Sequence, residues 1–378
     1  MFAQRSRPRV LLVAGTRPEC LKLASLYTAL RAQAQCDAVL VNSGQHEDMV
    51  RRTFAHLGIA CDITLPQLQP MSLSHGMSAL RARLRELARA QNAALVVSQG
   101  DTSTAYAAAL AARDADVPLA HVEAGLRTDH PWRPFPEELF RRRIARLAAL
   151  HFAPTAAAQR NLLDEGVAAS SVFQVGNTAI DLLRQELERP APGALPALSD
   201  ARALVTLTLH RRENYGRGLD VACGAMLDLL ERQPELALIC PVHPNPAVGA
   251  RIRRHLSGHA RIALVEPLDY RDFIAVLRRS CLVVTDSGGI QEEAPYLGLP
   301  VLVVRENTER PESVALGCAH LVPLQHERIV SEAQRMLHQA PPARVDFALA
   351  PYGDGRSGVR IAALIAEHLS RTAVSSAA

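Results

Sequence analysis

Short runs of aliphatic and β-branched residues recur along this chain, and segments of helical length separate them. The first series of runs is Val10–Ala14, Ala38–Asn42, Ala94–Ser98, Leu119–Val122, His151–Ala153 and Val172–Gly176. Helix-like segments lie among them at Cys20–Gln33, Met77–Ala90, Ser103–Asp114 and Ala179–Glu188. Strands that alternate with helices form βαβ units, which build a parallel sheet covered by helices on both faces. The pattern therefore predicts an α/β fold.

A second series of the same kind follows a Pro-, Ala- and Gly-rich segment, Arg189–Asp200, which is typical of a loop near a domain boundary. Its runs are Ala203–Leu207, Ala237–Pro241, Ile262–Val265, Cys281–Thr285 and Val301–Val304. A chain of 378 residues suits two domains. We expect two doubly wound, Rossmann-like domains that face a cleft, one at 1–175 and one at 176–357. The C-terminal helix within 358–378 is expected to complete the first domain.

Composition excludes several classes of protein. Hydrophobic residues make up 48% and charged residues 21%, as in soluble globular proteins. No apolar stretch reaches the roughly 18 residues of a membrane span, and no signal peptide is recognisable, so we expect a cytoplasmic protein without a membrane partner. The net charge of +4 is too small and too dispersed to indicate nucleic-acid binding. The seven cysteines form no CxxC pair, which favours buried free thiols.

Polar clusters, four of them containing glycine, follow the predicted strands directly. They are Gly15–Glu19, Gln99–Ser103, His121–Arg127, His210–Asn214, Pro241–Asn245 and Asp286–Glu293. Loop solubility would explain one such cluster, but not six of similar composition. Ligands of doubly wound folds bind at the carboxyl ends of the strands, so these clusters predict a binding site in the cleft.

The segment Asp286–Glu293 has the features of a phosphate site. We expect Ser287 to cap the following helix, while Gly288 and Gly289 let a ligand approach the backbone closely. Exposed amides at a helix N-terminus favour an anion. Charge-assisted contacts from basic residues would extend the site to a diphosphate, and the candidates are Arg17, Lys22 and Arg310.

The first half of the chain supplies acids instead. Asp101, Glu123 and Glu137 each stand at the beginning of a loop or helix. Carboxylates that converge in a partly dry cleft act as general acids or bases. The alternative is that each caps a helix or pairs with an arginine such as Arg127 or Arg141. His210 and His243 lack the spacing of metal ligands, so we expect hydrogen-bonding or proton-transfer roles and no metal.

Ordered motifs along nearly the whole chain resemble those of one family. They are Gly15–Glu19, Gly44–His46, Gly100–Thr102, His121–Arg127, Phe135–Glu138, His210–Asn214, Thr285–Pro295, Thr308–Glu312 and Tyr352–Gly355. In these motifs the chain resembles the non-hydrolysing UDP-N-acetylglucosamine 2-epimerases, whose two-domain fold is also called GT-B. Phe140 departs from the pattern, because the family usually has Asn there, and we expect different local packing near Glu137.

The resemblance implies that the chain interconverts UDP-N-acetylglucosamine and UDP-N-acetylmannosamine without a redox cofactor. In this family the C2 proton is removed and UDP leaves, giving a bound 2-acetamidoglucal. UDP then adds back while C2 takes a proton on the opposite face. A homodimer and a role in surface polysaccharide synthesis are also implied.

The resemblance also implies roles for individual residues. The sugar would be surrounded by Asp101, Glu123, Glu137 and His210. The uracil would lie near Phe273 and the backbone at Leu268. The rest of the UDP group would be held by Arg17, Lys22, Ser287, Gly288, Gly289, Glu293 and Arg310.

Three other functions stay open at this point. A GT-B glycosyltransferase would share the nucleotide site but has no need to remove a C2 proton, which the acid cluster suggests. A hydrolysing epimerase would release free N-acetylmannosamine and UDP. A non-catalytic sensor would bind a UDP-sugar without turnover.

Lys22 is the only lysine among the 42 basic residues, which indicates a position that requires a compact ammonium group. We predict that Lys22→Arg lowers activity although the charge is kept, because the larger planar guanidinium displaces the contact. Steady-state kinetics of the two proteins would check this. Wild-type kinetics in the variant would contradict the argument from the lone lysine.

Overall fold

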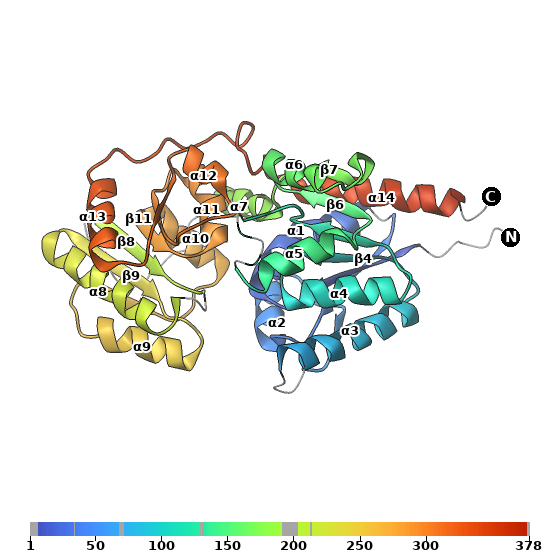
Figure 1. Cartoon of the computed structure of the whole chain (residues 1–378), viewed down its shortest axis with the longest axis horizontal. Helices are drawn as coiled ribbons and strands as arrows, with labels where there is room; N and C mark the ends of the chain where they lie inside the picture. The colour runs from blue at the N-terminus through green and yellow to red at the C-terminus, as the bar shows by residue number, and fades with distance from the viewer. Residues whose placement is uncertain are drawn as a thin grey trace. The chain divides into compact units, whose positions relative to one another are not determined.

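The computed structural model describes residues 7–33, 35–67, 72–128, 130, 132, 134–190, 203–211 and 214–375. The chain forms two compact units (Figure 1). Unit 1 contains residues up to Arg184 and residues from Pro351 onward, and unit 2 contains Gln185–Ala350. Most of the predicted loop Arg189–Asp200 lies outside the described residues. The predicted domain limits and the cleft stay predictions.

Unit 1 contains a seven-stranded parallel sheet in the order β3-β2-β1-β4-β5-β6-β7. Its strands are β1 (Arg9–Ala14), β2 (Asp37–Asn42), β3 (Ile63–Thr64), β4 (Ala93–Gln99), β5 (Leu119–Val122), β6 (Leu150–Ala153) and β7 (Val172–Gln174). Its helices are α1 (Arg17–Gln33), α2 (Glu47–His56), α3 (Leu73–Ala90), α4 (Ser103–Asp114), α5 (Glu137–Ala145), α6 (Ala156–Asp164), α7 (Thr178–Glu188), whose last residues pass into unit 2, and α14 (Ser357–Ser375).

Unit 2 contains a six-stranded parallel sheet in the order β10-β9-β8-β11-β12-β13. Its strands are β8 (Ala203–Thr208), β9 (Leu236–Pro241), β10 (Ile262–Val265), β11 (Ser280–Thr285), β12 (Val301–Val304) and β13 (Ala319–Val322). Its helices are α8 (Arg217–Arg232), α9 (Pro246–Leu256), α10 (Tyr270–Arg279), α11 (Gly288–Leu297), α12 (Pro311–Ala315) and α13 (His326–Leu337).

The predicted doubly wound α/β fold is confirmed in both units. Each predicted strand is present within two residues of its expected ends, and two short strands, β3 and β13, were not predicted. In both sheets the direction of winding reverses at the first strand: β1 pairs with β2 and β4, and β8 pairs with β9 and β11. Ligands of such sheets bind where the order reverses. Loops after β1 and β4, and after β8 and β11, are therefore the places to examine for a site.

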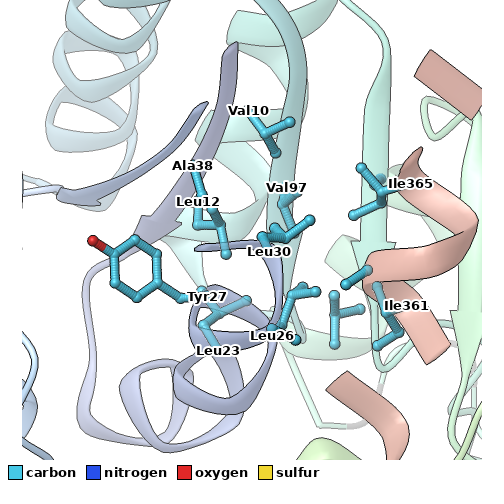
Figure 2. Packing of buried hydrophobic residues seen from close by; sticks show 14 of the residues in the cluster. Val10, Leu12, Leu23, Leu26, Tyr27, Leu30, Ala38, Val97, Ile361 and Ile365 are labelled. Atoms are coloured by element: carbon cyan, nitrogen blue, oxygen red, sulfur yellow. The ribbon is translucent and has the colours of Figure 1, made fainter. Parts of the chain in front are cut away.

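The strands near these reversals are buried on both sides, as central strands of a parallel sheet are. Val10 and Leu12 face a core formed with α1 and α14 (Figure 2), whereas Leu11 and Val13 belong to a second core with α3, α4 and α5. One face of the unit 1 sheet is thus covered by two helices, α1 and α14, that lie near opposite ends of the described chain. Within the described residues, no helix is long and apolar enough to span a membrane.

Helix α14 packs on α1 at a close backbone contact. A Cβ atom at Gly358 would lie 2.7 Å from the carbonyl carbon of Ser25 and 2.8 Å from the amide of Leu26. The buried carboxylate of Asp181 accepts hydrogen bonds from the amides of Ser357 (2.9 Å) and Gly358 (2.6 Å) and so fixes the start of α14. Glycine is required at position 358 because α1 leaves no room for a side chain.

We predict that Gly358→Ala destabilises the protein by about 1–3 kcal/mol, because the new methyl group forces α14 away from α1. Urea denaturation would measure the change in the free energy of unfolding. Gly76, in helix α3, is a matched control because a Cβ atom there meets nothing within 4 Å. Gly76→Ala should stabilise by about 0.5–1 kcal/mol through helix propensity. Equal effects of the two substitutions would contradict the steric argument.

Candidate active site

Lys22 and Glu123 form a buried ion pair at the carboxyl edge of the unit 1 sheet. Their side chains are each 9% exposed, and Gln99 donates a hydrogen bond of 2.7 Å to the same oxygen of Glu123. Lys22 lies in α1, Gln99 ends β4 and Glu123 follows β5. The lone lysine therefore contacts one of the predicted catalytic carboxylates, in a space where an ammonium group fits closely.

The backbone at Glu123 is in the left-handed region, with φ of 66°. This conformation is uncommon for a residue with a Cβ atom and is kept only where the surrounding structure enforces it. Here Ala124 donates to the carbonyl of Phe152, and Gly125 has no room for a Cβ atom, which would lie 2.1 Å from the carbonyl oxygen of Ala158. The turn aims Glu123 at Lys22.

Asp101 stands in the loop between β4 and α4, and its side chain is 32% exposed. The Nε of Arg141 lies 3.4 Å from its carboxylate. Beside it, the buried His121 donates from Nε2 to the carbonyl of Gly100 (2.8 Å), and burial lowers the pKa of His121 to about 4. A neutral imidazole thus supports the turn that carries Asp101.

Glu137 begins helix α5 and is partly exposed, whereas the next residue, Glu138, is fully buried. Glu138 pairs with Arg141 (3.3 Å) and Arg142 (2.9 Å). Burial raises the pKa of Glu138, and these arginines oppose the shift. Arg141, itself 2% exposed, therefore links Glu138 to Asp101 and holds the start of α5 beside the β4–α4 loop.

The alternative that the acids only cap helices or pair with arginines is true in part. Asp101 does pair with Arg141, but the N-cap residues of α4 and α5 are Thr102 and Pro136. Arg127 makes a bidentate ion pair with a different acid, Glu165, with nitrogen–oxygen distances of 2.8 and 2.7 Å.

Phe140, where the family pattern has Asn, makes an aromatic contact. Its ring stacks on Tyr106 of α4, with ring centroids 4.9 Å apart, and the guanidinium of Arg143 lies 5.9 Å from the Tyr106 ring centroid. An apolar contact between α4 and α5 thus occupies this position, one turn after Glu137.

In unit 2, the buried carboxylate of Asp286 holds the loop that follows β8. It accepts from the amides of His210 (2.9 Å) and Arg211 (3.0 Å) and from the side chain of Asn214 (2.7 Å). The ring of His210 is exposed, and its Nε2 lies 2.5 Å from the hydroxyl of Thr208. Arg212 and Glu213 of this motif lie outside the described residues.

His243 supports the same loop through Tyr215. The Nδ1 of His243 accepts from the amide of Asn245 (3.0 Å), so its Nε2 carries the proton and donates to the Tyr215 oxygen (3.1 Å). The Tyr215 hydroxyl in turn donates to the carbonyl of His210 (3.1 Å). His243 therefore has the predicted hydrogen-bonding role.

The start of α11 differs from the prediction in one respect. Ser287 occupies the N-cap position, but its hydroxyl makes no capping hydrogen bond, so the prediction of a serine cap is wrong. The amides of the first turn are therefore not satisfied by this side chain, which suits a bound anion.

The two glycines at this helix end have different explanations. A Cβ atom at Gly288 would lie 2.4 Å from the guanidinium carbon of Arg310, so Arg310 rests directly on the backbone of α11. Among the described residues, a Cβ atom at Gly289 would meet only the Ser287 hydroxyl, at 3.9 Å. Close packing within this part of the protein therefore does not explain the glycine at position 289.

Other predicted binding residues surround this helix. Glu293 is buried in α11 and accepts from the Tyr270 hydroxyl (2.7 Å), while Arg310 pairs with Glu292 (2.9 Å) and Glu309 (2.8 Å). Leu268 lies just before α10 and Phe273 lies in its first turn, and both are partly buried. In unit 1, Arg17 begins α1 and is also partly buried.

Sequence reasoning missed several residues that hold these loops, above all Glu19 and Asp286. Glu19 had a usable signal, because Thr16 and Glu19 have the spacing of a helix capping box. No sequence signal marks Asp286, because its three hydrogen-bond donors lie more than 70 residues away in the chain.

One group of possible metal ligands occurs among the described residues, at Asp228, His326 and Glu327. It lies on α8 and α13, away from the loops above. Arg232 already donates to both oxygens of Asp228 at 2.8 Å, so this carboxylate serves as an arginine partner.

Comparisons with known proteins agree on one family. A family model for UDP-N-acetylglucosamine 2-epimerase matches residues 28–366. The UDP-N-acetylglucosamine 2-epimerase of Salmonella typhimurium is 37% identical, over 93% of this chain and 97% of the relative. Two crystal structures are similar: the Neisseria meningitidis enzyme bound to UDP-GlcNAc (33% identity, TM-score 0.87, 95% and 100% coverage) and the Methanocaldococcus jannaschii enzyme with UDP-GlcNAc and UDP (30% identity, TM-score 0.83, 94% and 99% coverage).

The neutral His121 predicts a pH dependence of stability. Its pKa is about 4 in the folded protein and 6.5 in the unfolded chain, so the unfolded state binds more protons between these values. Stability is therefore lost as the pH falls from 6.5 to 4, by about 3 kcal/mol from this residue. His121→Gln removes the titration and keeps a donor for Gly100. Chemical denaturation across this range should give a flatter profile for the variant, and parallel profiles would contradict the prediction.

Proposed function

The chain belongs to the UDP-N-acetylglucosamine 2-epimerase family, and from this premise we propose that it interconverts UDP-N-acetylglucosamine and UDP-N-acetylmannosamine without hydrolysis. The observation that carries the proposal is the placing of acids at one edge of the unit 1 sheet. Asp101 follows β4, Glu123 follows the neighbouring strand β5, and Arg141 ties the start of α5, which bears Glu137, to Asp101. Removal of a C2 proton needs such groups, whereas sugar transfer does not.

Unit 2 supplies the features expected for the nucleotide. The uncapped amides at Gly288 and Gly289 and the guanidinium of Arg310 favour a diphosphate. Glu293 is a buried acceptor suited to the ribose hydroxyls, and the Phe273 ring and the backbone at Leu268 are the proposed neighbours of uracil. Firm binding of the diphosphate keeps the leaving group in place between the two halves of the reaction.

The reaction is a balanced elimination and addition. A carboxylate takes the C2 proton, the bond from C1 to the UDP oxygen breaks with its electron pair, and a C1–C2 double bond forms. UDP then re-forms the bond at C1, and an acid delivers a proton to the opposite face of C2. Asp101, Glu123, Glu137 and His210 are the proposed groups, and the choice of C2 base among the carboxylates stays open.

Lys22 fits a role in the charge balance of this site. Its ammonium compensates Glu123 inside a nearly dry environment, where unpaired charges are costly. The substrate brings two further negative charges on its diphosphate, and Arg17, at the N-terminus of the same helix, is a proposed partner for one of them.

Incubation with UDP-N-acetylglucosamine in deuterium oxide, followed by proton NMR, tests the proposal. We expect UDP-N-acetylmannosamine to appear and the C2 proton of both sugars to be replaced by deuterium. Release of free N-acetylmannosamine and UDP would instead indicate a hydrolysing enzyme. Binding without exchange would indicate a sensor or a transferase that lacks its acceptor.

We predict that Asp101→Asn lowers C2 exchange by about 100-fold or more, as expected for loss of a general acid or base. UDP affinity should be kept within about twofold, because an amide of the same shape leaves the nucleotide contacts intact. Asp220→Asn is a matched control: Asp220 is also 32% exposed and paired with an arginine, but lies on α8. Equal exchange in the two variants would remove Asp101 from the set.

A further inference from the structure

The carboxylate of Glu19 joins two loops of the candidate site. One oxygen accepts from the amides of Gly15 (2.8 Å) and Thr16 (2.7 Å) and from the Thr16 hydroxyl (2.9 Å). The other oxygen accepts from the Thr102 hydroxyl (2.5 Å). Glu19 is fully buried, so these contacts occur out of reach of water.

The first three contacts resemble a helix capping box, in which the third residue of a helix reaches back to the N-cap. The contact with Thr102 goes beyond a capping box, because Thr102 lies 83 residues further along the chain. Thr102 is itself the N-cap of α4 and accepts from the amide of Ala105 (3.0 Å). Glu19 thus connects the N-termini of α1 and α4 through one hydroxyl.

The two loops also touch directly. A Cβ atom at Gly15 would lie 2.2 Å from the hydroxyl of Thr104 and 2.4 Å from that of Ser43. The β1–α1 loop and the start of α4 are therefore packed without spare room, and the geometry at Glu19 is passed on to both.

Each loop carries a proposed reacting group. Asp101 is the residue before Thr102, and Lys22, which holds Glu123, lies one turn beyond Glu19 in α1. We propose that Glu19 is a positioning residue, which sets the place of Asp101 relative to the Lys22–Glu123 pair. This inference rests on the proposed function, because it assigns Glu19 a task in the same proton transfer.

A cap alone does not account for the placing of this carboxylate. A capping glutamate works at a solvent-exposed helix end, where its charge stays hydrated. Here burial raises the pKa of Glu19, and the hydrogen bonds from Thr102, Gly15 and Thr16 oppose that shift. A buried carboxylate costs free energy unless its acceptors are filled, and all the filling donors come from these two loops.

The test compares substitutions that separate capping from positioning. In Glu19→Gln the amide oxygen can still accept from Gly15 and Thr16, but the NH2 group faces Thr102. The charge-assisted link that the Thr102 hydroxyl donates to the carboxylate is then broken, and the NH2 group can offer only a weaker, neutral hydrogen bond in the opposite direction. Thr102→Val removes the hydroxyl from the other side, and Thr102→Ser keeps it. Asp181→Asn is the control, because it is another buried carboxylate that accepts two amides at a helix start in unit 1.

We expect Glu19→Gln and Thr102→Val each to lower kcat for C2 exchange by about 10- to 100-fold, as small misplacements of reacting groups do. UDP affinity should change by less than about twofold. Thr102→Ser should keep most of the wild-type kcat. Because both substitutions break the same link, the double variant should lose little more than either single one. Asp181→Asn should lower the melting temperature and leave kcat unchanged.

A purely structural role for Glu19 predicts a different pattern of melting temperatures and kcat values. If Glu19→Gln lowers the melting temperature but not kcat, or if the two losses in the double variant multiply, the positioning role is wrong. If Glu19→Gln does not fold, the pair Thr102→Val and Thr102→Ser decides, and equal kcat values for that pair overturn the proposal. A wild-type protein without C2 exchange would instead overturn the proposed function, which the deuterium experiment shows separately.

Discussion

In each unit, a buried carboxylate ties together the two loops that flank the reversal of strand order. In unit 1, Glu19 joins the loop after β1 to the loop after β4. In unit 2, Asp286, which follows β11, holds the loop after β8. Parallel strands bring these loops to one edge but leave their backbone amides without partners. A carboxylate that accepts several amides satisfies both loops and fixes the distance between them, and the candidate site is built on that distance.

One residue with a left-handed backbone lies at this edge, beside a buried ion pair. Glu123 keeps a left-handed backbone because the turn after β5 is fixed by Ala124 and Gly125 on one side and by Lys22 on the other. At the start of α11, by contrast, the amides lack a side-chain cap. The first site holds its own charges in balance, whereas the second leaves positive potential for a ligand to complete.

The sequence predicts much of this architecture, because runs buried on both faces of a sheet are strongly apolar. Strands β3 and β13 are not predicted in this way, because β3 has only two residues and β13 contains the polar His320. Helices α1 and α3 begin three or four residues before their predicted starts, because polar first turns precede the apolar periodicity. The motifs predict candidate residues in the segments that follow the strands, but the pairing of Arg127 with Glu165 and the uncapped Ser287 depend on contacts that no local pattern records.

Unit 1 draws its residues from both ends of the described chain, and this affects how the protein is made. During synthesis, α1 and the strands beneath it leave the ribosome before unit 2, whereas α14, which covers Leu26 and contributes Ile361 to the same core, emerges after unit 2. Unit 2 is continuous and can complete its core in the meantime, since domains fold as units during translation. The apolar face that α14 covers therefore stays exposed in the nascent first unit while more than 300 further residues are synthesised. That interval is when the chain has its greatest need of a chaperone.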